Sequence, residues 1–598
     1  MAGGYMGKIL FVDLATGEIR VDTPEEQLYR DFIGGYGVGA RIIYSRQKAG
    51  ADPLGPENML GFTTGPLTGG NFPSGSRFTV VAGRSPLTQG WGDANGGGDF
   101  GPTLKAAGYD CVFFTGAAER PVYLFVDDGR AELRNASRLW GKDIYETEDA
   151  LQAEHGKDTS VAAIGRAGEK LSLISCIINR RTAAAGRSGL GAVMGSKNVK
   201  ALAVRGSQSI PIAAAEENDQ LYKQLMAELR AVKNALAPMR KYGTTSHAAD
   251  SAHNGDSPVK NWGGVGIVDF PDASGLKGDA AIANLWRAEP CWRCPLSCKG
   301  ILKEGTGEYK YPKGTARPEY ETQASFGTMC LNNDTESIAM ANHLCNDYGL
   351  DTISTGTTIA FAIECYENGL ITKEDTDGTA LTWGNHQAIL AMTEKMAKRE
   401  GFGDVLADGV KVAAEKIGRG AEQYAVHIGG QELGMHDPKY FRRREDTPTA
   451  RFQMDATPGR HTQGFGPSGF RTHVVNAAGV CVFYSMSVSG RRLVDGMRVA
   501  TGWDRSMGEL LKAGERIANM RHAINLREGI NPRDWEVHPR IIGEPPQEVG
   551  PLAGIRADIE AQINWNLGAL DWDRFTTKPS KRKLMELGLE DVAQDLWP

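Results

Sequence analysis

The chain has 598 residues, of which 75 are glycine, a share well above the usual level of about 7 %. Its 27 prolines, 41 % hydrophobic content and lack of a Gly-X-Y period exclude collagen and general disorder. A formal charge of −6 argues against a protein that binds nucleic acid by neutralising phosphates. No run of 18 apolar residues occurs, and the N-terminus lacks the basic and apolar sections of a signal peptide. We therefore expect a cytoplasmic protein that contacts neither nucleic acid nor membrane.

The first 205 or so residues predict a β-rich region in which strands alternate with Gly-rich loops. The expected strands are Lys8–Asp13, Glu18–Val21, Phe78–Val81, Cys111–Phe114, Val122–Val126 and Ala201–Val204. Near residue 210 the hydrophobic period changes from two to 3.6, which is typical of helices. The expected helices begin with a long one that carries Leu221, Leu225, Leu229, Val232 and Leu236 on one face, followed by Thr335–Tyr348, Gln387–Arg399, Val405–Ile417 and Met507–Leu526.

These patterns predict an α+β protein with a β-rich N-terminal domain at residues 1–208. The remainder of the chain, from residue 209, is expected to be mainly α-helical. It carries a cysteine motif and, farther along, Cys481 in a glycine-containing segment.

The strongest local signal is the motif Cys291-Trp-Arg-Cys294-Pro-Leu-Ser-Cys298. This Cys-x2-Cys-x3-Cys spacing places three thiolates on one short loop, which suits three corners of a single cubane iron–sulfur cluster. Structural zinc and plain buried thiols are the alternatives, but no second Cys or His pair stands nearby to complete a zinc site. Spacing alone does not name a fourth ligand among the remaining cysteines, which are Cys111, Cys176, Cys330, Cys345, Cys365 and Cys481.

Two segments share the pattern Asn-x-x-Gly-Leu/Val-x, and they lie 130 residues apart. They run from Asn346 to Asp351 and from Asn476 to Cys481. A doubled pattern suggests two equivalent elements around one symmetric ligand. The alternative is two unrelated helix ends, because glycine often ends a helix in this position.

Three further loops join glycines or small residues to Arg or Asn side chains. They are centred on Arg77, on Asn95 with Gly97, and on Arg180 to Gly191. Bare backbone N–H groups beside guanidinium donors suit phosphate oxygens, so three such loops predict a ligand with more than one phosphate. Tight turns between strands are the alternative. The glycines from Gly34 to Gly39 have the wrong spacing for a dinucleotide fingerprint, and no strand precedes them.

Taken together, the motifs resemble the aldehyde:ferredoxin oxidoreductase family of tungsten-pterin enzymes, and the chain is similar to its catalytic subunit. The resemblance runs from Tyr5 to about residue 535. Its motifs are Phe32-Ile-Gly-Gly-Tyr-Gly-Val-Gly-Ala40, Gly186-Arg-Ser-Gly-Leu-Gly-Ala-Val-Met-Gly-Ser-Lys-Asn198, Pro318-Glu-Tyr-Glu-Thr322, Gly349-Leu-Asp-Thr-Ile-Ser354, Gly479-Val-Cys481 and Asn525-Leu-Arg-Glu-Gly529.

The resemblance implies a β-rich domain that cradles a tungsten bis-molybdopterin cofactor, with Mg²⁺ bridging the pterin phosphates and one [4Fe-4S] cluster beside one pterin. It also implies two mainly α-helical domains that cover the cofactor, at residues 209–420 with the cysteine motif and at residues 421–598 with Cys481. It implies Cys481 as the fourth cluster ligand, with Cys291, Cys294 and Cys298 as the others. Cofactor-binding positions carried over from the family are Arg77, Asn95, Gly97, Ala184, Asn346, Asp351, Asn476 and Val480. Both repeated segments begin with Asn where the family often has Asp, which loses a negative charge but keeps a hydrogen-bond acceptor.

The activity implied by the resemblance is the oxidation of aldehydes to carboxylic acids. Glu321 matches the position of a general base or water-orienting carboxylate, with Glu319 as the alternative, and His436 matches a carbonyl hydrogen-bond donor. A helix-start glutamate and a core or capping histidine are the structural alternatives. His461 lies in a Gly-rich loop, and it is a candidate for the channel lining or a pterin contact. Glu336 and His343 form only a weak candidate pair for an additional iron site.

Electrons are expected to leave through the cluster to a ferredoxin or a ferredoxin-like subunit, alone or with a flavin subunit, within an oligomer or hetero-complex. Arg293, Lys299 and Lys303 are candidates for the docking face. Two alternatives remain: the catalytic subunit of a tungsten-dependent ring-reducing aroyl-thioester reductase, whose metal can carry a cysteine ligand, and a non-redox protein with a structural zinc or cluster. Cys330 is the one spare cysteine near Glu321.

Overall fold

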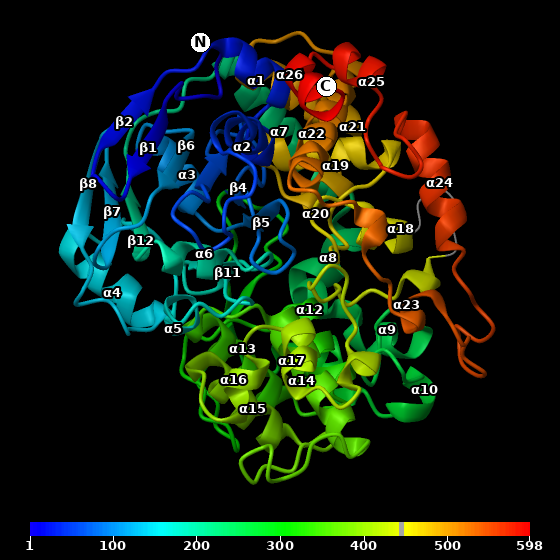
Figure 1. The fold of residues 1–598 in the computed structure, drawn as a ribbon. Coiled ribbons are helices and arrows are strands. Elements are labelled where there is room, and N and C mark those ends of the chain that lie inside the picture. Colours follow the sequence, from blue (N-terminus) through cyan, green and yellow to red (C-terminus); the bar gives the residue numbers. More distant parts are fainter. Residues whose placement is uncertain (442–447) are drawn as a thin grey trace.

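The computed structural model describes residues 1–441 and 448–598. Its N-terminal part contains two six-stranded mixed sheets, seen on the left of Figure 1 in blue to teal. The first sheet has the order β2-β1-β6-β3-β4-β5, and the second has the order β11-β10-β9-β12-β7-β8. The strands are β1 (Ile9–Asp13), β2 (Ile19–Asp22), β3 (Leu60–Thr64), β4 (Phe78–Ala82), β5 (Gly92–Gly96), β6 (Cys111–Thr115), β7 (Val122–Asp127), β8 (Arg130–Asn135), β9 (Ser160–Ala163), β10 (Ile177–Asn179), β11 (Ala183–Ala185) and β12 (Val199–Arg205).

The two sheets approach each other through their edge strands β5 and β11, which are in contact. Both edges therefore face the middle of the molecule, where Figure 1 shows them close to the helical parts. Helices on the sheets are α1 (Glu26–Phe32), α2 (Gly35–Arg46), α3 (Phe100–Ala106), α4 (Ile144–His155), α5 (Arg166–Glu169) and α6 (Leu190–Ser196).

After β12 the described chain is mainly helical and forms only one further sheet, the short antiparallel pair β13 (Leu285–Ala288) and β14 (Gly300–Leu302). The helices up to residue 420 are α7 (Ala215–Ala231), α8 (Lys233–Tyr242), α9 (Ala248–Asn254), α10 (Gly266–Asp269), α11 (Gly278–Ile282), α12 (Tyr320–Gln323), α13 (Thr335–Tyr348), α14 (Thr352–Glu367), α15 (His386–Lys398), α16 (Phe402–Leu406) and α17 (Val410–Ile417). Those that follow are α18 (Pro448–Met454), α19 (Phe470–Ala478), α20 (Val482–Met486), α21 (Gly490–Thr501), α22 (Met507–Arg527), α23 (Pro539–Ile542), α24 (Ile559–Leu570), α25 (Lys581–Glu586) and α26 (Glu590–Leu596).

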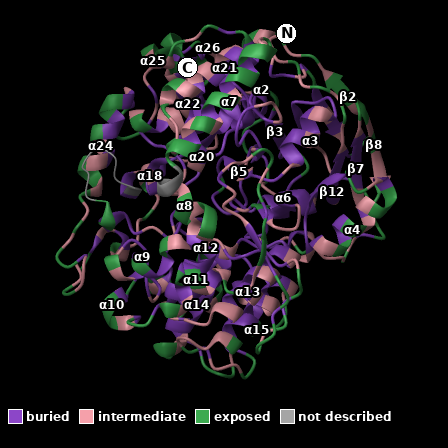
Figure 2. Ribbon diagram, turned by 180° about the vertical axis from the view of Figure 1, so that it is seen from behind, coloured by how far each residue is buried: buried purple, intermediate pink, exposed green. Residues whose placement is uncertain are grey.

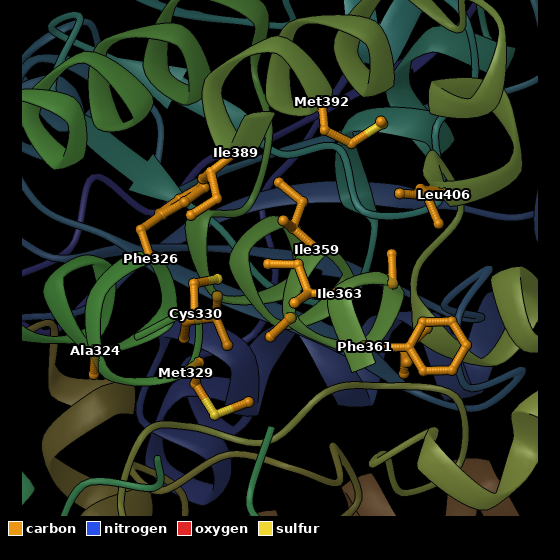
Figure 3. Packing of buried hydrophobic residues seen from close by; sticks show 14 of the residues in the cluster. Ala324, Phe326, Met329, Cys330, Ile359, Phe361, Ile363, Ile389, Met392 and Leu406 are labelled. Atoms are coloured by element: carbon orange, nitrogen blue, oxygen red, sulfur yellow. The ribbon is translucent and has the colours of Figure 1, made fainter. Parts of the chain in front are cut away.

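The helical part has two packing centres. A core around Phe326, Ile359 and Phe361 joins α14 to α15 and to a π-helical turn, as Figure 3 shows. A second core packs α19 and α22 against α2 of the sheet region, so the C-terminal helices close over the N-terminal part. Figure 2 shows the buried residues concentrated where these parts meet.

The expected fold class is confirmed, since two sheets are followed by a mainly helical remainder. All six expected strands and the helices Thr335–Tyr348, Gln387–Arg399 and Met507–Leu526 are present within about two residues. Two expected helices are divided. The one after Pro211 breaks at Val232, and Val405–Ile417 separates into α16 and α17 because Gly409 has a positive φ of 87°. In the described residues no helix is long and apolar enough to cross a membrane.

Candidate active site

A cavity of about 750 Å³ lies where the edge strands of the two sheets meet the helical parts. Most of the residues that the sequence predicts for the site line it. They are Arg77, Asn95, Gly97, Ala184, Cys298, Glu321, Asn346, Asp351 and His436. The remaining predicted residues do not line the cavity. They are Cys291, Cys294, Asn476, Val480 and Cys481.

The four predicted cluster cysteines come together beside this cavity, although Cys481 is 183 positions after Cys298 in the sequence. Ser74 links two of them, because its Oγ donates to Cys294 Sγ at 3.2 Å and its carbonyl accepts from the N–H of Cys481 at 3.2 Å. Gly97 touches the same group, since a Cβ there would stand 3.1 Å from Cys291 Sγ.

The sulfur atoms of these cysteines do not stand as close together as the ligands of a zinc site do. Four thiolates bound to zinc at about 2.3 Å would stand about 3.8 Å apart. Across residues 1–441 and 448–598, however, no three of these sulfurs lie within 4.8 Å of one another. In the described residues these sulfurs therefore do not form a compact set of zinc ligands.

Arg77 connects the cysteines with the cavity. Its guanidinium donates to Cys481 Sγ at 3.4 Å, and the residue also lines the cavity. Burial alone would raise the pKa of Cys481, but the charge and hydrogen bond of Arg77 outweigh it and lower that pKa. A thiolate is the form of cysteine that binds metal ions, so the contact with Arg77 favours that form of Cys481.

The two repeated segments form equivalent corners between helices. α13 ends at Gly349 (φ 77°), and α14 begins after Asp351. α19 ends at Gly479 (φ 81°), and α20 begins after Cys481. The helix-end interpretation is therefore correct for both glycines, but it leaves open what the two corners bind.

Each corner is hydrogen-bonded to a loop of a different sheet. Asp351 donates its N–H to Ile174 O at 3.0 Å, beside the second sheet. Cys481 bonds to Ser74, and Gly479 O accepts from the N–H of Arg77 at 3.1 Å, beside the first sheet. The arrangement thus has two similar halves, as a ligand with two equivalent parts would require.

The polar residues at the corners are already engaged with neighbours. Asn476 accepts a hydrogen bond from Asn95 Nδ2 at 2.7 Å and donates to the Tyr36 hydroxyl at 3.2 Å. Val480 is buried, so it can offer a ligand only its backbone or its apolar surface. Asp351 caps α14 and forms an ion pair with Arg187 at 2.9 Å.

Arg180 and Arg181 are directed away from the cavity. Arg180 pairs with Glu289, and Arg181 pairs with Glu148 and Asp149. Neither lines the cavity. The basic residue that this loop does bring to the site is Arg187, which sits in the Gly186–Asn198 motif and could have been singled out there.

Glu321 lies opposite two histidines. Its Oε1 is 3.6 Å from His436 Nε2 and 3.3 Å from His461 Nε2, while Oε2 accepts from the N–H of Met435 at 2.8 Å. His436 Nδ1 is in turn 2.9 Å from Asp256 Oδ1. The alternative carboxylate, Glu319, also lines the cavity, but its Oε2 accepts a hydrogen bond from Thr244.

Local structure holds these side chains in place. Glu321 lies in the first turn of α12, which continues directly into the π-helical turn Ala324–Thr328. Such turns are frequent at functional sites because they displace one turn of the helix from its regular register. The neighbouring Tyr320 stacks on the His436 ring at 4.7 Å between centroids and donates its hydroxyl to Met435 O.

The three titratable groups are shifted differently. Burial raises the pKa of Glu321, against the opposing charge of His436. Burial also lowers the pKa of His461 well below its ordinary value. For His436 burial acts in the same downward direction, but the Asp256 hydrogen bond and the Glu321 charge outweigh it and raise the pKa. Such divergent shifts in one pocket are typical of acid–base sites.

Glu336 and His343, the weak pair for an additional iron, are not joined as a ligand set in the described chain. Glu336 accepts from the backbone of Gly307, whereas the His343 ring packs edge-on against Tyr145. Burial lowers the pKa of His343 to about 4, as for a core histidine.

Models of the aldehyde ferredoxin oxidoreductase N-terminal domain and of its domains 2 and 3 match residues 9–206 and residues 220–463 and 467–589. The chain belongs to the aldehyde ferredoxin oxidoreductase family. A tungsten-containing aldehyde ferredoxin oxidoreductase of Pyrococcus furiosus is 36 % identical over 98 % of this chain and 99 % of its own length. One from Thermococcus kodakarensis is 36 % identical with the same coverage.

Two other proteins that are similar to this chain have names that state different activities. A P. furiosus protein named as the WOR-like subunit of an aliphatic sulfonate oxidoreductase is 29 % identical over 99 % of this chain and 98 % of its own length. A chain from the structure of the active-site complex BamBC of benzoyl coenzyme A reductase has the same fold, with a TM-score of 0.85 over 100 % of this chain and 98 % of that chain at 22 % identity. Family membership therefore makes this chain a tungsten-type oxidoreductase without naming its substrate.

Proposed function

We propose that this enzyme oxidises aldehydes to carboxylic acids at a tungsten bis-molybdopterin centre and passes the electrons through one [4Fe-4S] cluster to a ferredoxin-type partner. The observation that carries the proposal is the placement of Glu321 and His436 in a cavity that Arg77 links to the four cysteines. The proposed acid–base pair and the proposed route for electrons therefore lie beside the same cavity, as the oxidation of a carbonyl requires.

The residues around the cavity fit such a cofactor. Two similar corners, each tied to a different sheet, suit two pterins. Arg77 and Arg187 supply guanidinium groups for anionic oxygens, while Asn95 and Ala184, on the adjoining edge strands β5 and β11, offer oxygen atoms of the kind that Mg²⁺ prefers. Gly97 admits the cluster loop close to these strands.

The corner side chains complete the proposed cofactor site. Asn346 and Asp351 at one corner, and Asn476 and Val480 at the other, are proposed to hold the pterin rings. Asn346 and Asp351 line the cavity directly. Asn476 is proposed to act indirectly, through the hydrogen bond by which it orients the amide of Asn95.

Cys291, Cys294, Cys298 and Cys481 are proposed to hold the cluster. Replacement of Cys481 by Ala, followed by an iron count, tests the fourth ligand. We expect loss of iron and of electron transfer to an external acceptor. A full iron complement with undiminished electron transfer would assign the fourth position to another ligand. Cys365→Ala is a matched control, since Cys365 is a buried core thiol in α14.

In the proposed reaction, an aldehyde and a water molecule yield an acid, two protons and two electrons. The tungsten centre, when bound, supplies the two-electron acceptor. Glu321 takes a proton from the attacking water at Oε1, and this carboxylate is suited to the task because burial raises its pKa. His436, whose pKa Asp256 raises, donates from Nε2 to the carbonyl oxygen.

Two variants test these roles. Glu321→Gln keeps the shape of the side chain, His436→Asn keeps a polar group, and both remove the acid–base function. Positioned acid–base groups typically contribute about 10²–10⁴-fold, so turnover should fall by that factor while tungsten, pterin and iron contents stay unchanged. Turnover within a few-fold of the parent enzyme would remove that residue from the mechanism.

An aroyl-thioester reductase is the second candidate, and the cysteines weigh against it. Cys330, the spare cysteine near Glu321, is fully buried, and its sulfur faces the backbone carbonyls of Ser325 and Gly356. In the described chain Cys298 is the one cysteine that lines the cavity, and it is assigned to the cluster. Assays with aldehydes and with aroyl thioesters on the same preparation separate the two activities.

The proposed electron exit is the surface around the cysteine loop. Trp292, between two cluster cysteines, and Trp286 on β13 are 38 % and 46 % exposed, and exposed Trp is enriched at interfaces. Residues 285–313 contain six basic and three acidic side chains, although the whole chain carries −6. Lys299 and Lys303 are among the six, and Arg293 packs against Trp292. This surface suits an acidic ferredoxin.

Electron transfer to purified ferredoxin at rising ionic strength tests this exit, with a small uncharged dye as control. We expect the rate with ferredoxin to fall with salt and the rate with the dye to stay constant. Arg293→Glu should lower only the ferredoxin rate. If the purified chain reduces a nicotinamide cofactor without partner or flavin, or if salt leaves the ferredoxin rate unchanged, the proposed exit is wrong.

A further inference from the structure

A serine hydroxyl in α14 lies between two carboxyl groups beside the corner that joins α13 to α14. Ser354 Oγ is 2.9 Å from Asp351 Oδ2 and 2.6 Å from Glu432 Oε2, and all three residues are buried. A serine hydroxyl carries one hydrogen, whereas an ionised carboxylate only accepts hydrogen bonds. Two ionised carboxylates would leave one of these two contacts without a hydrogen, so one of the carboxyl groups holds a proton.

Asp351 has the surroundings of the ionised group. Its Oδ2 pairs with Arg187 Nη1 at 2.9 Å, and its Oδ1 accepts from the N–H of Ile353 at 3.1 Å. Together with the Ser354 hydroxyl, three donors meet this carboxylate. Hydrogen bonds and an opposite charge of this kind favour the charged form of an acid.

Glu432 has the surroundings of the protonated group. The residue is 0 % exposed, and its Oε1 accepts from the N–H of Val410 at 2.7 Å. Arg187 Nη2 donates to the backbone oxygen of Glu432, so this guanidinium pairs with Asp351 and not with the Glu432 carboxyl group. Burial raises the pKa of Glu432 and outweighs the hydrogen bonds and the Arg187 charge, which act in the opposite direction.

We infer that Glu432 is a positioning residue that stays protonated and donates to Ser354, so that Ser354 in turn donates to Asp351. Each of the two contacts then has one hydrogen, and Asp351 is the only anion of the three. The inference rests on the proposed role of Asp351 in holding a pterin ring. Asp351 Oδ1 is near the cavity, because it stands 3.9 Å from the Cβ position of Gly186, which lines it.

The backbone around Glu432 leaves room for its carboxyl group and holds it toward α14. A Cβ at Gly409 would stand 2.7 Å from Glu432 Oε1, and the φ of Gly409 is 87°, which side chains rarely adopt. The preceding residue, Gln431, accepts from the N–H of Ser188 at 3.0 Å through Oε1. Four residues after Glu432, the same segment carries His436. The segment therefore contributes both to the acid–base group and to the corner that presents Asp351.

Infrared spectroscopy tests the proton directly. A protonated carboxyl group has a carbonyl band that is separate from the bands of ionised carboxylates, and it shifts slightly in deuterium oxide. We expect this band at neutral and mildly alkaline pH in the difference between the parent enzyme and Glu432→Gln. The same pair in a Glu321→Gln background removes any contribution of Glu321. If the band is absent from that background, Glu432 does not hold the proton and the inference is overturned.

Thermal unfolding of two variants tests whether Glu432 is neutral in the folded protein. The amide of Glu432→Gln can donate to Ser354 and accept from Val410, as a protonated carboxyl group does, whereas Glu432→Ala can do neither. We expect the unfolding midpoint of the Gln variant to stay close to that of the parent. The Ala variant should unfold several degrees lower, because it leaves buried polar groups without partners.

Glu364→Gln is the matched contrast for this experiment. Two guanidinium nitrogens of Arg540 bind the Glu364 carboxylate at 2.7 Å and 2.8 Å, so this glutamate is ionised in the folded protein. Its replacement by Gln should lower the unfolding midpoint by several degrees. If Glu432→Gln lowers the midpoint as much as Glu364→Gln does, Glu432 is ionised as well and the inference is wrong.

Ser354→Ala tests the positioning role, since it removes the link between the two carboxyl groups. We expect the pterin content to fall several-fold and the iron content to stay unchanged, because the cluster cysteines do not lie at this corner. Glu432→Ala should lose pterin in the same way, and Glu432→Gln should retain it. The matched control is Thr357→Val, which removes a fully buried hydroxyl from the same helix that has no hydrogen-bond partner in the described chain.

The outcomes separate this inference from the proposed function. If the parent enzyme oxidises no aldehyde, the proposed function fails, but the infrared band and the pterin contents still test Glu432 because neither depends on turnover. If the parent oxidises aldehydes and the band is absent, the proposed function stands and the inference falls. A full pterin content in both Ser354→Ala and Glu432→Ala would overturn the positioning role even with the band present.

Discussion

The hydrogen bond between Asp256 and His436 allows a quantitative prediction. His436 Nδ1 lies 2.9 Å from Asp256 Oδ1, and Ser251 holds the other carboxylate oxygen at 3.2 Å. Asp256→Asn keeps a group of the same shape but removes the negative charge. A hydrogen bond to a charged group contributes about 1.5–3 kcal/mol. At about 1.36 kcal/mol per pKa unit, the pKa of His436 should fall by roughly one to two units.

If protonated His436 is the donor to the carbonyl, the alkaline limb of kcat should move to lower pH by the same one to two units. The measurement is a pH profile of aldehyde oxidation with a dye acceptor, recorded for Asp256→Asn in the parent and in a His436→Asn background. In the His436→Asn background, Asp256→Asn should leave the alkaline limb of kcat where it is. An unmoved alkaline limb in the parent background, or an equal loss of activity in both backgrounds, would refute the reasoning.

Two further predictions concern the core and the base. Phe361→Ala, at a fully buried ring of α14, should lower the free energy of unfolding by about 3–5 kcal/mol in denaturant titrations, whereas Phe575→Ala, at 81 % exposure, should change it by less than about 0.5 kcal/mol. Burial raises the pKa of Glu321, so the acidic limb of the pH–activity profile should have its midpoint above the ordinary glutamate pKa of about 4.3. A midpoint at the ordinary value would contradict the assignment of Glu321 as the base.

The sequence predicts much of this fold because many elements carry their signal locally. α13 and α22 begin and end where the hydrophobic period and their Asp334 and Ser506 caps indicate. β5 has the sequence Gly-Asp-Ala-Asn-Gly, which shows no hydrophobic alternation, so the sequence predicts a loop at this position. It is a strand because β4 provides its hydrogen-bond partners, and that pairing is tertiary information.

The site shows the same division. The cysteine loop is visible as a motif, but the resemblance to a family was needed to select Cys481 from six candidates. The contact of Asp256 with His436 joins residues 180 positions apart, and neither lies in a pattern that refers to the other. The same holds for His461 and Glu321. Tertiary packing alone decides such pairs, so their pKa shifts were not accessible to sequence reasoning.

The two helix corners give a last prediction, which separates cofactor binding from simple helix termination. Gly349 and Gly479 both have a φ near 80°, so Ala at either position strains the backbone by about 1–2 kcal/mol. An added Cβ at Gly479 would also stand 2.0 Å from Thr68 Oγ1, and at Gly349 it would stand 2.9 Å from Gly165 N. Gly369 is the matched control, because its φ is 70° and nothing lies within 4 Å of its Cβ position.

Gly479→Ala should lower the iron content, because it displaces the corner that carries Cys481 two residues later. Gly349→Ala should lower the pterin content and leave iron in place, because its corner presents Asp351 to the cavity and no cluster ligand. Iron is counted by elemental analysis and pterin by fluorescence after oxidation, with Gly369→Ala expected to retain both. If both corner variants lose iron equally, the prediction is wrong. Such a result would mean that each substitution only damages the local fold, and that the corners serve to end helices without binding different groups.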